Sequence, residues 1–260
     1  MTRGLWDRET VALLLAAALL PVAVIWFWLE GAQAVSRIIF ALALMGGWQI
    51  VFLIARAQPP SLSMVVIALA ISILAPEGLG LLQLGIGISF GFVVGELVFG
   101  GWGRNILNPA TVALAFLGFA FPAFDWPQPL VPVAWAALPA GIIGIALGVM
   151  PVGVFLGAAF VGGVGVFFGF LSPISFEAAG LVLVLLVCDP VSSASTRLGG
   201  WMNGALYTGF VVLFDLFWAG AAPVQIAVSA AFLAALAAPL LDEAAIAIWI
   251  AQRRKRHGRT

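Results

Sequence analysis

The sequence predicts an all-α polytopic membrane protein, and two properties of the chain lead to that class. Of the 260 residues, 63% are hydrophobic and only 8% are charged, whereas soluble domains carry roughly 25% charged residues. Apolar runs of about 20 residues, long enough to cross a hydrocarbon core of about 30 Å, recur along most of the chain. Because these runs are long and continuous, they favour membrane helices over the short alternating strands of a transmembrane barrel.

We expect about ten transmembrane helices joined by short connections. The predicted ranges are 10–29, 37–55, 61–75, 80–99, 109–122, 131–149, 151–171, 177–188, 202–219 and 223–241. The first run has no small-residue cleavage site in a suitable place, so we interpret it as a retained helix rather than a signal peptide. The chain is therefore expected to form one integral membrane domain over residues 1–260, without a soluble domain.

The basic residues support an even number of spans with both termini in the cytoplasm. In that arrangement the outer side receives only Arg37. The cytoplasmic side receives Arg3, Arg8, Arg56, Arg104, Arg197, Arg253, Arg254, Lys255, Arg256 and Arg259. This asymmetry obeys the positive-inside rule and predicts a multi-pass protein of the bacterial inner (cytoplasmic) membrane. The tail "RRKRHGR" suits an anchor on anionic lipid, with a specific docking site as the alternative.

The counts of cysteine and histidine exclude several cofactors. A lone Cys188 cannot make an internal disulfide, a four-thiolate iron–sulfur cluster or a zinc site. A lone His257 cannot form a bis-histidine haem site. We therefore predict no haem, no zinc and no other metal site.

A first polar cluster lies in "GELVFGGWGRNILNPA", residues 95–110. Asn108 followed by Pro109 predicts the start of a helix, because asparagine caps free N–H groups and proline suits the first helical position. The glycines at 100, 101 and 103 allow backbone conformations that other residues avoid. The stretch is either an ordinary capped turn or part of a functional site, and the residues alone do not decide between the two.

Glu96, in the same stretch, lies at the membrane boundary, where a carboxylate is costly and usually functional. Arg104 could pair with Glu96, or could hold an anionic ligand at the start of the next helix. Gly87, Gly91 and Gly95 share one face of the preceding span. Tight helix packing explains this spacing better than a ligand contact does.

A second polar cluster is "CDPVSSASTRLGGW", residues 188–201, after a short apolar span. Pro190 predicts that the helix ends at Asp189, and short spans often mark sites where broken helices meet. The alternative is a polar connection in which Ser192 or Ser193 caps the next helix.

Four acids in the apolar chain, Glu96, Asp189, Asp215 and Asp242, indicate an ion path or a ligand shell. Ser192 and Ser193 are included in this candidate path. The alternative is that these acids are boundary residues that reach water. No catalytic residue is assigned.

Three ordered motifs resemble the NqrB/RnfD family. "FGGWGRNILNPA" is similar to its F/Y-G-G-x-G-x-N-x-x-N-P-A pattern, "CDPVSSASTRLGG" to its T-D-P-V stretch, and "APLLD" with the basic tail to its C-terminal end. The resemblance covers about residues 80–122 and 177–256, and the first 75 residues agree only in being membrane spans. Family members are membrane subunits of the sodium-pumping NADH:quinone oxidoreductase and of the Rnf ferredoxin:NAD oxidoreductase.

The resemblance implies ten helices in two inverted five-helix halves, a fold likened to urea transporters. It also implies non-covalent riboflavin and quinone, with the quinone region near the double glycine. The expected cofactor contacts are Gly100, Gly101, Trp102, Arg104, Asn105 and Asn108, and Asp189 and Asp242 match further polar positions of the family.

The chain departs from the family where the flavin is attached. Family members carry FMN esterified to a threonine in a long insert after the fifth helix. Here that region is "FAFPAFDWPQPLVPVAW", with no threonine between Phe121 and Trp135. Thr196 in "SSASTR" resembles the acceptor but belongs to a cytoplasmic stretch. We therefore predict no covalent FMN, and at most non-covalent riboflavin, FMN or quinone.

The favoured interpretation is a membrane subunit of an NqrB/RnfD-like electron-transport complex, which could also translocate ions and is not catalytic alone. The alternatives are a permease or channel for a small solute or ion, and a non-catalytic membrane scaffold. The expected partners are the lipid bilayer and other membrane redox subunits, with a homo-oligomer left open and no nucleic acid.

Overall fold

The computed structural model describes residues 7–257, with side chains up to Arg253. Within that range the chain forms eleven α-helices and two short π-helices, with no strand. The elements are α1 Arg8–Ala18, α2 Leu20–Glu30, α3 Ala32–Arg56, α4 Ser63–Leu74, α5 Leu81–Phe92, η1 Val93–Leu97, α6 Pro109–Ala120, α7 Val131–Ala146, α8 Val152–Phe167, α9 Pro173–Val182, η2 Leu183–Val187, α10 Arg197–Phe217 and α11 Pro223–His257. Arg3 and Arg259, which contribute to the charge pattern, lie outside the described residues.

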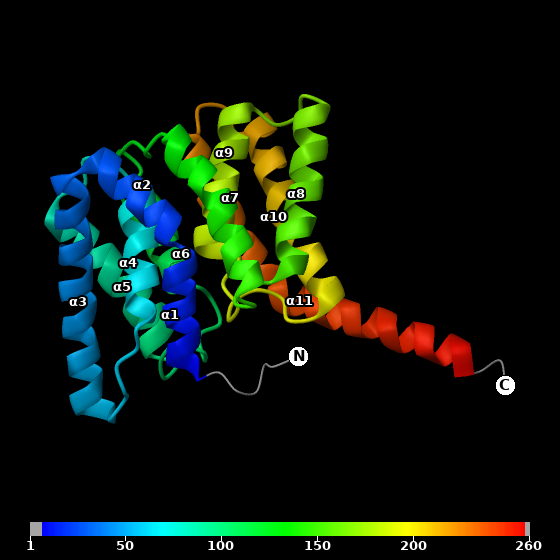
Figure 1. Ribbon diagram of the computed structural model, residues 1–260, viewed down its shortest axis with the longest axis horizontal. Coiled ribbons are helices and arrows are strands. Elements are labelled where there is room, and N and C mark those ends of the chain that lie inside the picture. Colours follow the sequence, from blue (N-terminus) through cyan, green and yellow to red (C-terminus); the bar gives the residue numbers. More distant parts are fainter. Residues whose placement is uncertain (1–6, 258–260) are drawn as a thin grey trace.

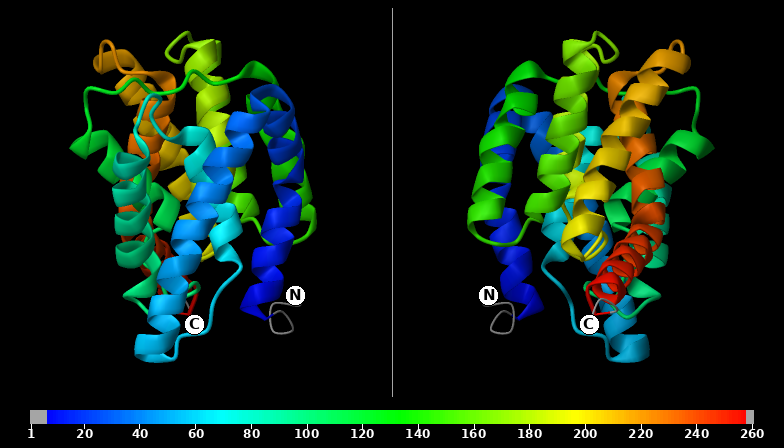
Figure 2. Two further views of the ribbon diagram at one scale, coloured as in Figure 1. Left: turned by 90° about the vertical axis from the view of Figure 1, so that its left-hand side faces the viewer. Right: turned by 90° about the vertical axis from the view of Figure 1, so that its right-hand side faces the viewer.

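The helices form one bundle. Helix α3 runs along one edge, and α8 and α10 lie toward the other (Figure 1). Helix α11 begins at the upper end of the bundle, descends behind α7 and α9, and its last turns extend beyond the base, to the lower right in Figure 1. The start of α1 and the end of α11 lie toward the same end of the bundle (Figure 2).

Each predicted span overlaps one helix, or two helices that follow each other directly. By length and apolar composition, α3 and the Pro223–Arg253 part of α11 could each cross a membrane alone. Six other apolar helices have 10–17 residues, and at 1.5 Å per residue they fall short of a core of about 30 Å. A polytopic helical architecture fits the structure, while the count of ten crossings stays a prediction.

The first predicted span is not one straight helix. It is divided into α1 and α2, which are bent by 50° at Leu19. Pro21 lies in the first turn of α2, where a backbone N–H would have no partner within the helix. Inside a continuous helix the same proline would remove a hydrogen bond. The predicted end of the last span, at residue 241, is also wrong, because α11 continues from Pro223 to His257 without interruption.

The outer surface of the bundle is apolar. Trp28 is 87% exposed, Phe167 83% and Ile54 81%, although soluble proteins seldom expose large contiguous apolar patches. Several polar side chains are buried instead, among them Glu96, Asn203 and Thr208. This distribution fits a molecule whose outside contacts lipid and whose polar groups face inward.

Glycines set the closest helix contacts. A Cβ atom at Gly91 of α5 would lie 2.5 Å from the backbone nitrogen of Ala113 in α6. Gly87 and Gly95 likewise face Leu117 and Pro109 of α6. The packing interpretation of this glycine face is confirmed.

Candidate functional site

Glu96 lies in η1, at the end of the span that begins with α5. Its side chain is fully buried, and both carboxylate oxygens accept from the Ser63 hydroxyl, at 3.1 and 3.2 Å. The π-helix matters here because an extra residue in one turn changes the direction in which the following side chains point, and such turns are frequent at functional sites.

Of the two roles left open for Arg104, the structure does not show the pairing with Glu96. Arg104 is exposed and its side chain folds over Gly100, because the tight glycine turn directs it away from the bundle. In the part of the chain that the structure describes, the one ion pair joins Arg8 Nε to Glu9 Oε1 at 3.6 Å. The charge of Glu96 therefore has a hydroxyl donor rather than a cation beside it.

Asp189 follows the second π-helix, η2, and is 7% exposed. Its carboxylate accepts from the Ser192 hydroxyl at 2.8 Å and from the Val191 backbone N–H at 3.3 Å. The structure thus brings Ser192 to Asp189, as the candidate ion path requires. Ser193 donates its backbone N–H to the Asp189 carbonyl, and its side chain is only partly buried.

Neither Ser192 nor Ser193 caps the next helix, contrary to the alternative considered from the sequence. Thr196 is the N-cap of α10 and accepts from the Gly199 N–H at 3.0 Å. The chain after Pro190 runs on beyond the two serines before it enters the helix, so the capping position falls on Thr196.

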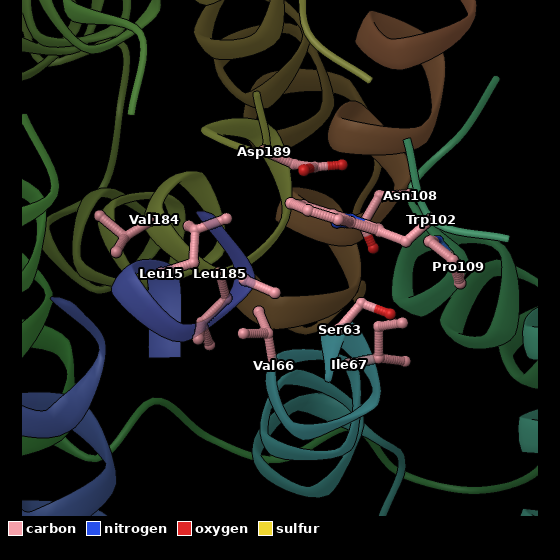
Figure 3. A pocket seen from close by; sticks show the side chains of 11 residues that line it. Leu15, Ser63, Val66, Ile67, Trp102, Asn108, Pro109, Val184, Leu185 and Asp189 are labelled. Carbon is pink, nitrogen blue, oxygen red and sulfur yellow. The ribbon is translucent and has the colours of Figure 1, made fainter. Parts of the chain in front are cut away.

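A cavity of about 20 Å³ lies between α1, α4, η2 and the segment from Trp102 to Pro109. Its polar lining consists of Ser63, Asn108 and Asp189 (Figure 3), together with the ring of Trp102. Because Ser63 also donates to Glu96, the two buried acids are connected through one hydroxyl and one cavity. A space of this size holds about one water-sized guest.

The glycine turn between η1 and α6 shapes one wall of this cavity. Gly100, Gly101 and Gly103 have φ angles of 99°, 96° and 92°, which L side chains rarely adopt. Their N–H groups bond to the Leu97 carbonyl, the Glu96 carbonyl and the Asn105 side chain within the turn. The turn thus uses its own backbone donors, and this arrangement does not favour a flavin or quinone at the double glycine.

Asn105 and Asn108 have structural partners as well. Asn105 also donates to the Leu107 carbonyl at 3.1 Å. Asn108 caps α6 by accepting from the Ala110 and Thr111 N–H groups, which confirms the predicted helix start. Its amide group faces the cavity (Figure 3), so Asn108 both starts a helix and contributes to the polar lining.

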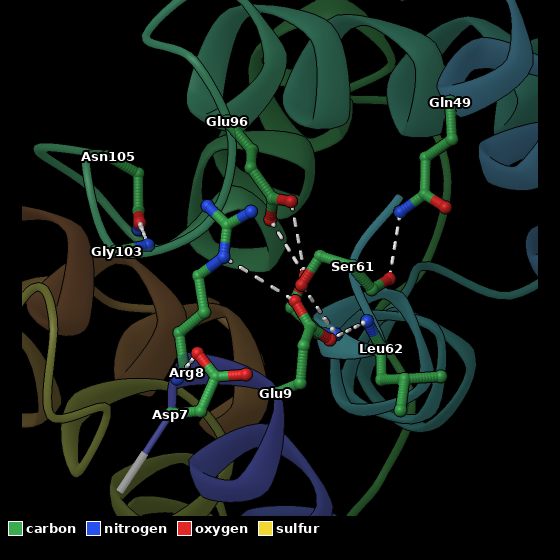
Figure 4. A network of polar contacts seen from close by, with 10 residues as sticks. Asp7, Arg8, Glu9, Gln49, Ser61, Leu62, Glu96, Gly103 and Asn105 are labelled. Atoms are coloured by element: carbon green, nitrogen blue, oxygen red, sulfur yellow. Dashed lines mark hydrogen bonds and ion pairs between the residues drawn. The ribbon is translucent and has the colours of Figure 1, made fainter. Parts of the chain in front are cut away.

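A polar network lies where α1 and α4 begin (Figure 4). Glu9 accepts from the Leu62 N–H at 2.9 Å, and Gln49 donates to the Ser61 carbonyl at 2.8 Å. Neither Glu9 nor Ser63 was identified from the sequence. The signal available was the pair Ser61 and Ser63 after two prolines, at the start of an otherwise apolar segment.

The structure places Asp215 and Asp242 away from the cavity. Asp215 in α10 accepts from the Ser172 N–H at 2.8 Å and from the Ser175 hydroxyl, at the start of α9. Asp242 in α11 accepts four hydrogen bonds from Ser195 and Thr196, at 2.6 to 3.0 Å. Both acids hold the first residues of another helix in place.

The apolar helical bundle has one buried carboxylate, Asp189, on the wall of a small cavity and a second, Glu96, joined to that wall through Ser63, and these features define a membrane protein with polar groups at its centre. The chain belongs to the NQR2, RnfD, RnfE family, whose model matches residues 5–184. The match includes residues 5–75, for which the sequence motifs showed only membrane spans.

Curated relatives share one description, each being a subunit of a Na(+)-translocating NADH-quinone reductase. The chain is 44% identical over 96 residues to the protein of Yersinia pestis, covering 36% of this chain and 23% of that one. It is 35% identical over 121 residues to the protein of Chromohalobacter salexigens, covering 46% and 29%. It is 39% identical over 97 residues to the protein of Azotobacter vinelandii, covering 37% and 24%. The aligned part spans about a quarter of the length of these relatives.

Proposed function

We propose that this chain is a membrane subunit of an NQR/Rnf-type electron-transport complex and that its central cavity holds the translocated ion. The observation that carries the proposal is the position of Ser63, which donates to the buried Glu96 and lies on the cavity wall opposite Asp189. The cavity wall offers the Asp189 carboxylate, the Ser63 hydroxyl and the Asn108 amide, and oxygen ligands of this kind suit a hard monovalent cation or a proton.

The size of the cavity favours an ion over a solute. A space of about 20 Å³ accommodates one water or one dehydrated small cation, whereas a permease for urea-sized solutes needs more room. The permease and the passive scaffold are therefore weaker alternatives. A scaffold also has no need to bury two acids, which are expensive at bilayer depth.

The proposal includes two halves of inverted topology. The stretch from Glu96 to Gly101, "ELVFGG", has a counterpart in "DLFWAG", from Asp215 to Gly220. The acid in each stretch accepts from a serine at the start of another helix, Ser63 or Ser175. In both stretches the final glycine has a positive φ, 96° and 86°. Inverted repeats place the transport site near their interface.

We propose that this chain carries no covalent FMN. The Thr196 hydroxyl donates to Asp242 and accepts from Gly199, so an ester there would break the start of α10. The segment between Phe121 and Trp135 has no threonine. Flavin chemistry would then be supplied by partner subunits in the same membrane. We also propose that the chain spans the membrane as one domain, with both termini in the cytoplasm.

Ion uptake into inside-out vesicles from cells that express the complete complex tests the proposal. Glu96→Gln and Asp189→Asn remove one charge each and keep the side-chain shape. We expect each variant to lower sodium or proton uptake at least tenfold, while NADH- or ferredoxin-dependent electron transfer falls less.

Glu243→Gln is the matched control, because Glu243 is exposed on α11; it should retain wild-type uptake. Unchanged uptake in both Glu96→Gln and Asp189→Asn, at equal protein levels, would contradict the ion site. Mass spectrometry of the intact chain tests the flavin statement, and a mass increase equal to FMN would overturn it.

A further inference from the structure

A second cavity, of about 420 Å³, lies at the end of the bundle where α2 meets α3 and α7 begins, opposite the start of α1 (Figure 1). It shares no lining residue with the small cavity described above. Its floor is apolar and includes the buried Leu74 and Leu181, whereas Glu30, Arg37 and Glu77 line its more exposed part. Its volume lies within the range of sites that enclose a small organic ligand, about 300–1,000 Å³.

The cavity offers groups that bind an anion. Gln33 and Arg37 both line it, and because they are four residues apart on α3 they share one helix face. Gly31, at the start of α3, provides no side-chain cap, so the first N–H groups of α3 lack an acceptor within the helix. The positive end of a helix beside an arginine favours a phosphate. Arg37 is also the one basic residue that the charge pattern predicts on the outer side of the membrane.

The same cavity offers groups that bind a cation. Glu30 is the last residue of α2, and Glu77 follows the end of α4 at Leu74. The last carbonyl groups of a helix carry partial negative charge, which adds to that of the two carboxylates. Within residues 7–253 the one ion pair is that of Arg8 and Glu9, at the other end of the bundle, so Arg37 pairs with neither acid. A ligand that carries both charges satisfies this lining better than a pure anion or a pure cation.

The cavity lies at the margin of the lipid-facing surface. Trp28 and Leu29, which directly precede Glu30 in α2, are exposed, and Val131 at the start of α7 is 54% exposed. Tryptophan at such a margin is typical of the level of the lipid headgroups. Among compounds with both charges, phospholipids with an amine in the headgroup are therefore the ones that a bilayer supplies at this depth.

We propose that this cavity binds the phosphoethanolamine group of a zwitterionic phospholipid, with the phosphate at Arg37 and the start of α3 and the primary ammonium at Glu30 and Glu77. A primary ammonium donates three hydrogen bonds, which the two carboxylates accept. The quaternary ammonium of a choline headgroup donates none and is instead bound by cages of aromatic rings, whereas Trp26 is the only aromatic residue in this lining. The site goes beyond the proposed function and does not depend on the ion cavity.

Isothermal titration calorimetry of the delipidated full chain in maltoside micelles tests the site. The probes are the dihexanoyl forms of phosphatidylethanolamine, phosphatidylcholine and phosphatidylglycerol, together with soluble glycerophosphoethanolamine. We expect phosphatidylethanolamine to bind at least about tenfold more tightly than the other two lipids, because only its headgroup has both charges and donors for the carboxylates. Glycerophosphoethanolamine should bind more weakly than the lipid; equal binding would keep the site but overturn its assignment to a lipid.

Substitutions separate the two charges of the ligand. Glu30→Gln should weaken phosphatidylethanolamine binding by more than about tenfold and leave phosphatidylglycerol binding no weaker. Glu77→Gln, at an exposed position, should weaken the former roughly 2- to 5-fold. Arg37→Gln should weaken both lipids. Arg56→Gln is the matched control, because Arg56 is exposed at the other end of α3, outside the cavity lining, and it should bind as the wild type does.

Equal wild-type affinities for phosphatidylethanolamine and phosphatidylglycerol would overturn the proposal, as would a Glu30→Gln variant that weakens both lipids equally. Wild-type binding in Arg37→Gln would contradict the phosphate contact. If that variant does not fold, Arg37→Lys keeps the charge, loses the two-point contact and should weaken both lipids by a smaller factor. Glu96→Gln should bind the lipid as the wild type does, so failure of the ion site and failure of the lipid site are distinguishable.

Discussion

The start of α10 should depend on a single carboxylate from α11. Asp242 accepts from the backbone N–H groups of Ser195 and Thr196, at 2.8 and 2.9 Å, and from their hydroxyls, at 3.0 and 2.6 Å. Hydrogen bonds to a charged group contribute about 1.5–3 kcal/mol each. Because Ser195 is exposed and water replaces part of this set, we expect Asp242→Ala to lower the free energy of unfolding by about 2–4 kcal/mol.

Thermal unfolding of the purified chain in detergent measures this effect. A loss of that size should lower the unfolding midpoint by roughly 5–15 °C. Glu243→Ala, the neighbouring exposed acid, is the control and should unfold as the wild type does. If Asp242→Ala keeps the wild-type unfolding midpoint but loses ion uptake, the structural role of Asp242 at the start of α10 is refuted and Asp242 belongs to the ion path.

Three further substitutions test the packing and the helix ends by the same unfolding measurement. Gly91→Ala should lower the free energy of unfolding by at least about 2 kcal/mol, because its Cβ would meet the backbone of Ala113. Gly46→Ala, the control, has open space around it and should not lower it. Equal stabilities of the two variants would contradict the packing of α5 on α6. Asn108→Ala should lower the free energy of unfolding by about 1 kcal/mol through the lost cap of α6. Asn108→Ser should restore most of it, because serine caps a helix without adding a charge beside Asp189. An Asn108→Ala variant as stable as the wild type would speak against that role. Tyr207→Phe should cost about 1 kcal/mol, since its hydroxyl donates to a buried carbonyl at 2.9 Å; no loss would show that the bond contributes nothing.

The sequence predicted the positions of the helices because apolar runs in this chain are long and their ends carry specific residues. Asn108 followed by Pro109 marked a helix start, and Asp189 followed by Pro190 marked an end. The glycines before Glu96 predicted a close helix contact, which α6 provides. These features depend on local chemistry that can be read in a few neighbouring residues.

The centre of the candidate site was less predictable because it depends on contacts between distant segments. Ser63 is one serine in an apolar helix, and only the fold places it beside Glu96. The two π-helices, which turn Glu96 and Asp189 toward the centre, have no apolar periodicity that separates them from ordinary helix. The sequence left the role of Arg104 open because nearness along the chain does not decide where a long side chain points.

The contact between α8 and α10 has a mechanical consequence. Gly157 meets the carbonyl of Trp201, and Gly204 meets the carbonyl of Val154, so the two backbones touch without side chains between them. Sliding one helix past the other would bring side-chain-bearing positions into these glycine contacts, so we expect the pair to move together. The cavity in which we propose an ion is lined by α1 and by no residue of α8 or α10, so we expect any widening that admits the ion at the bend between α1 and α2.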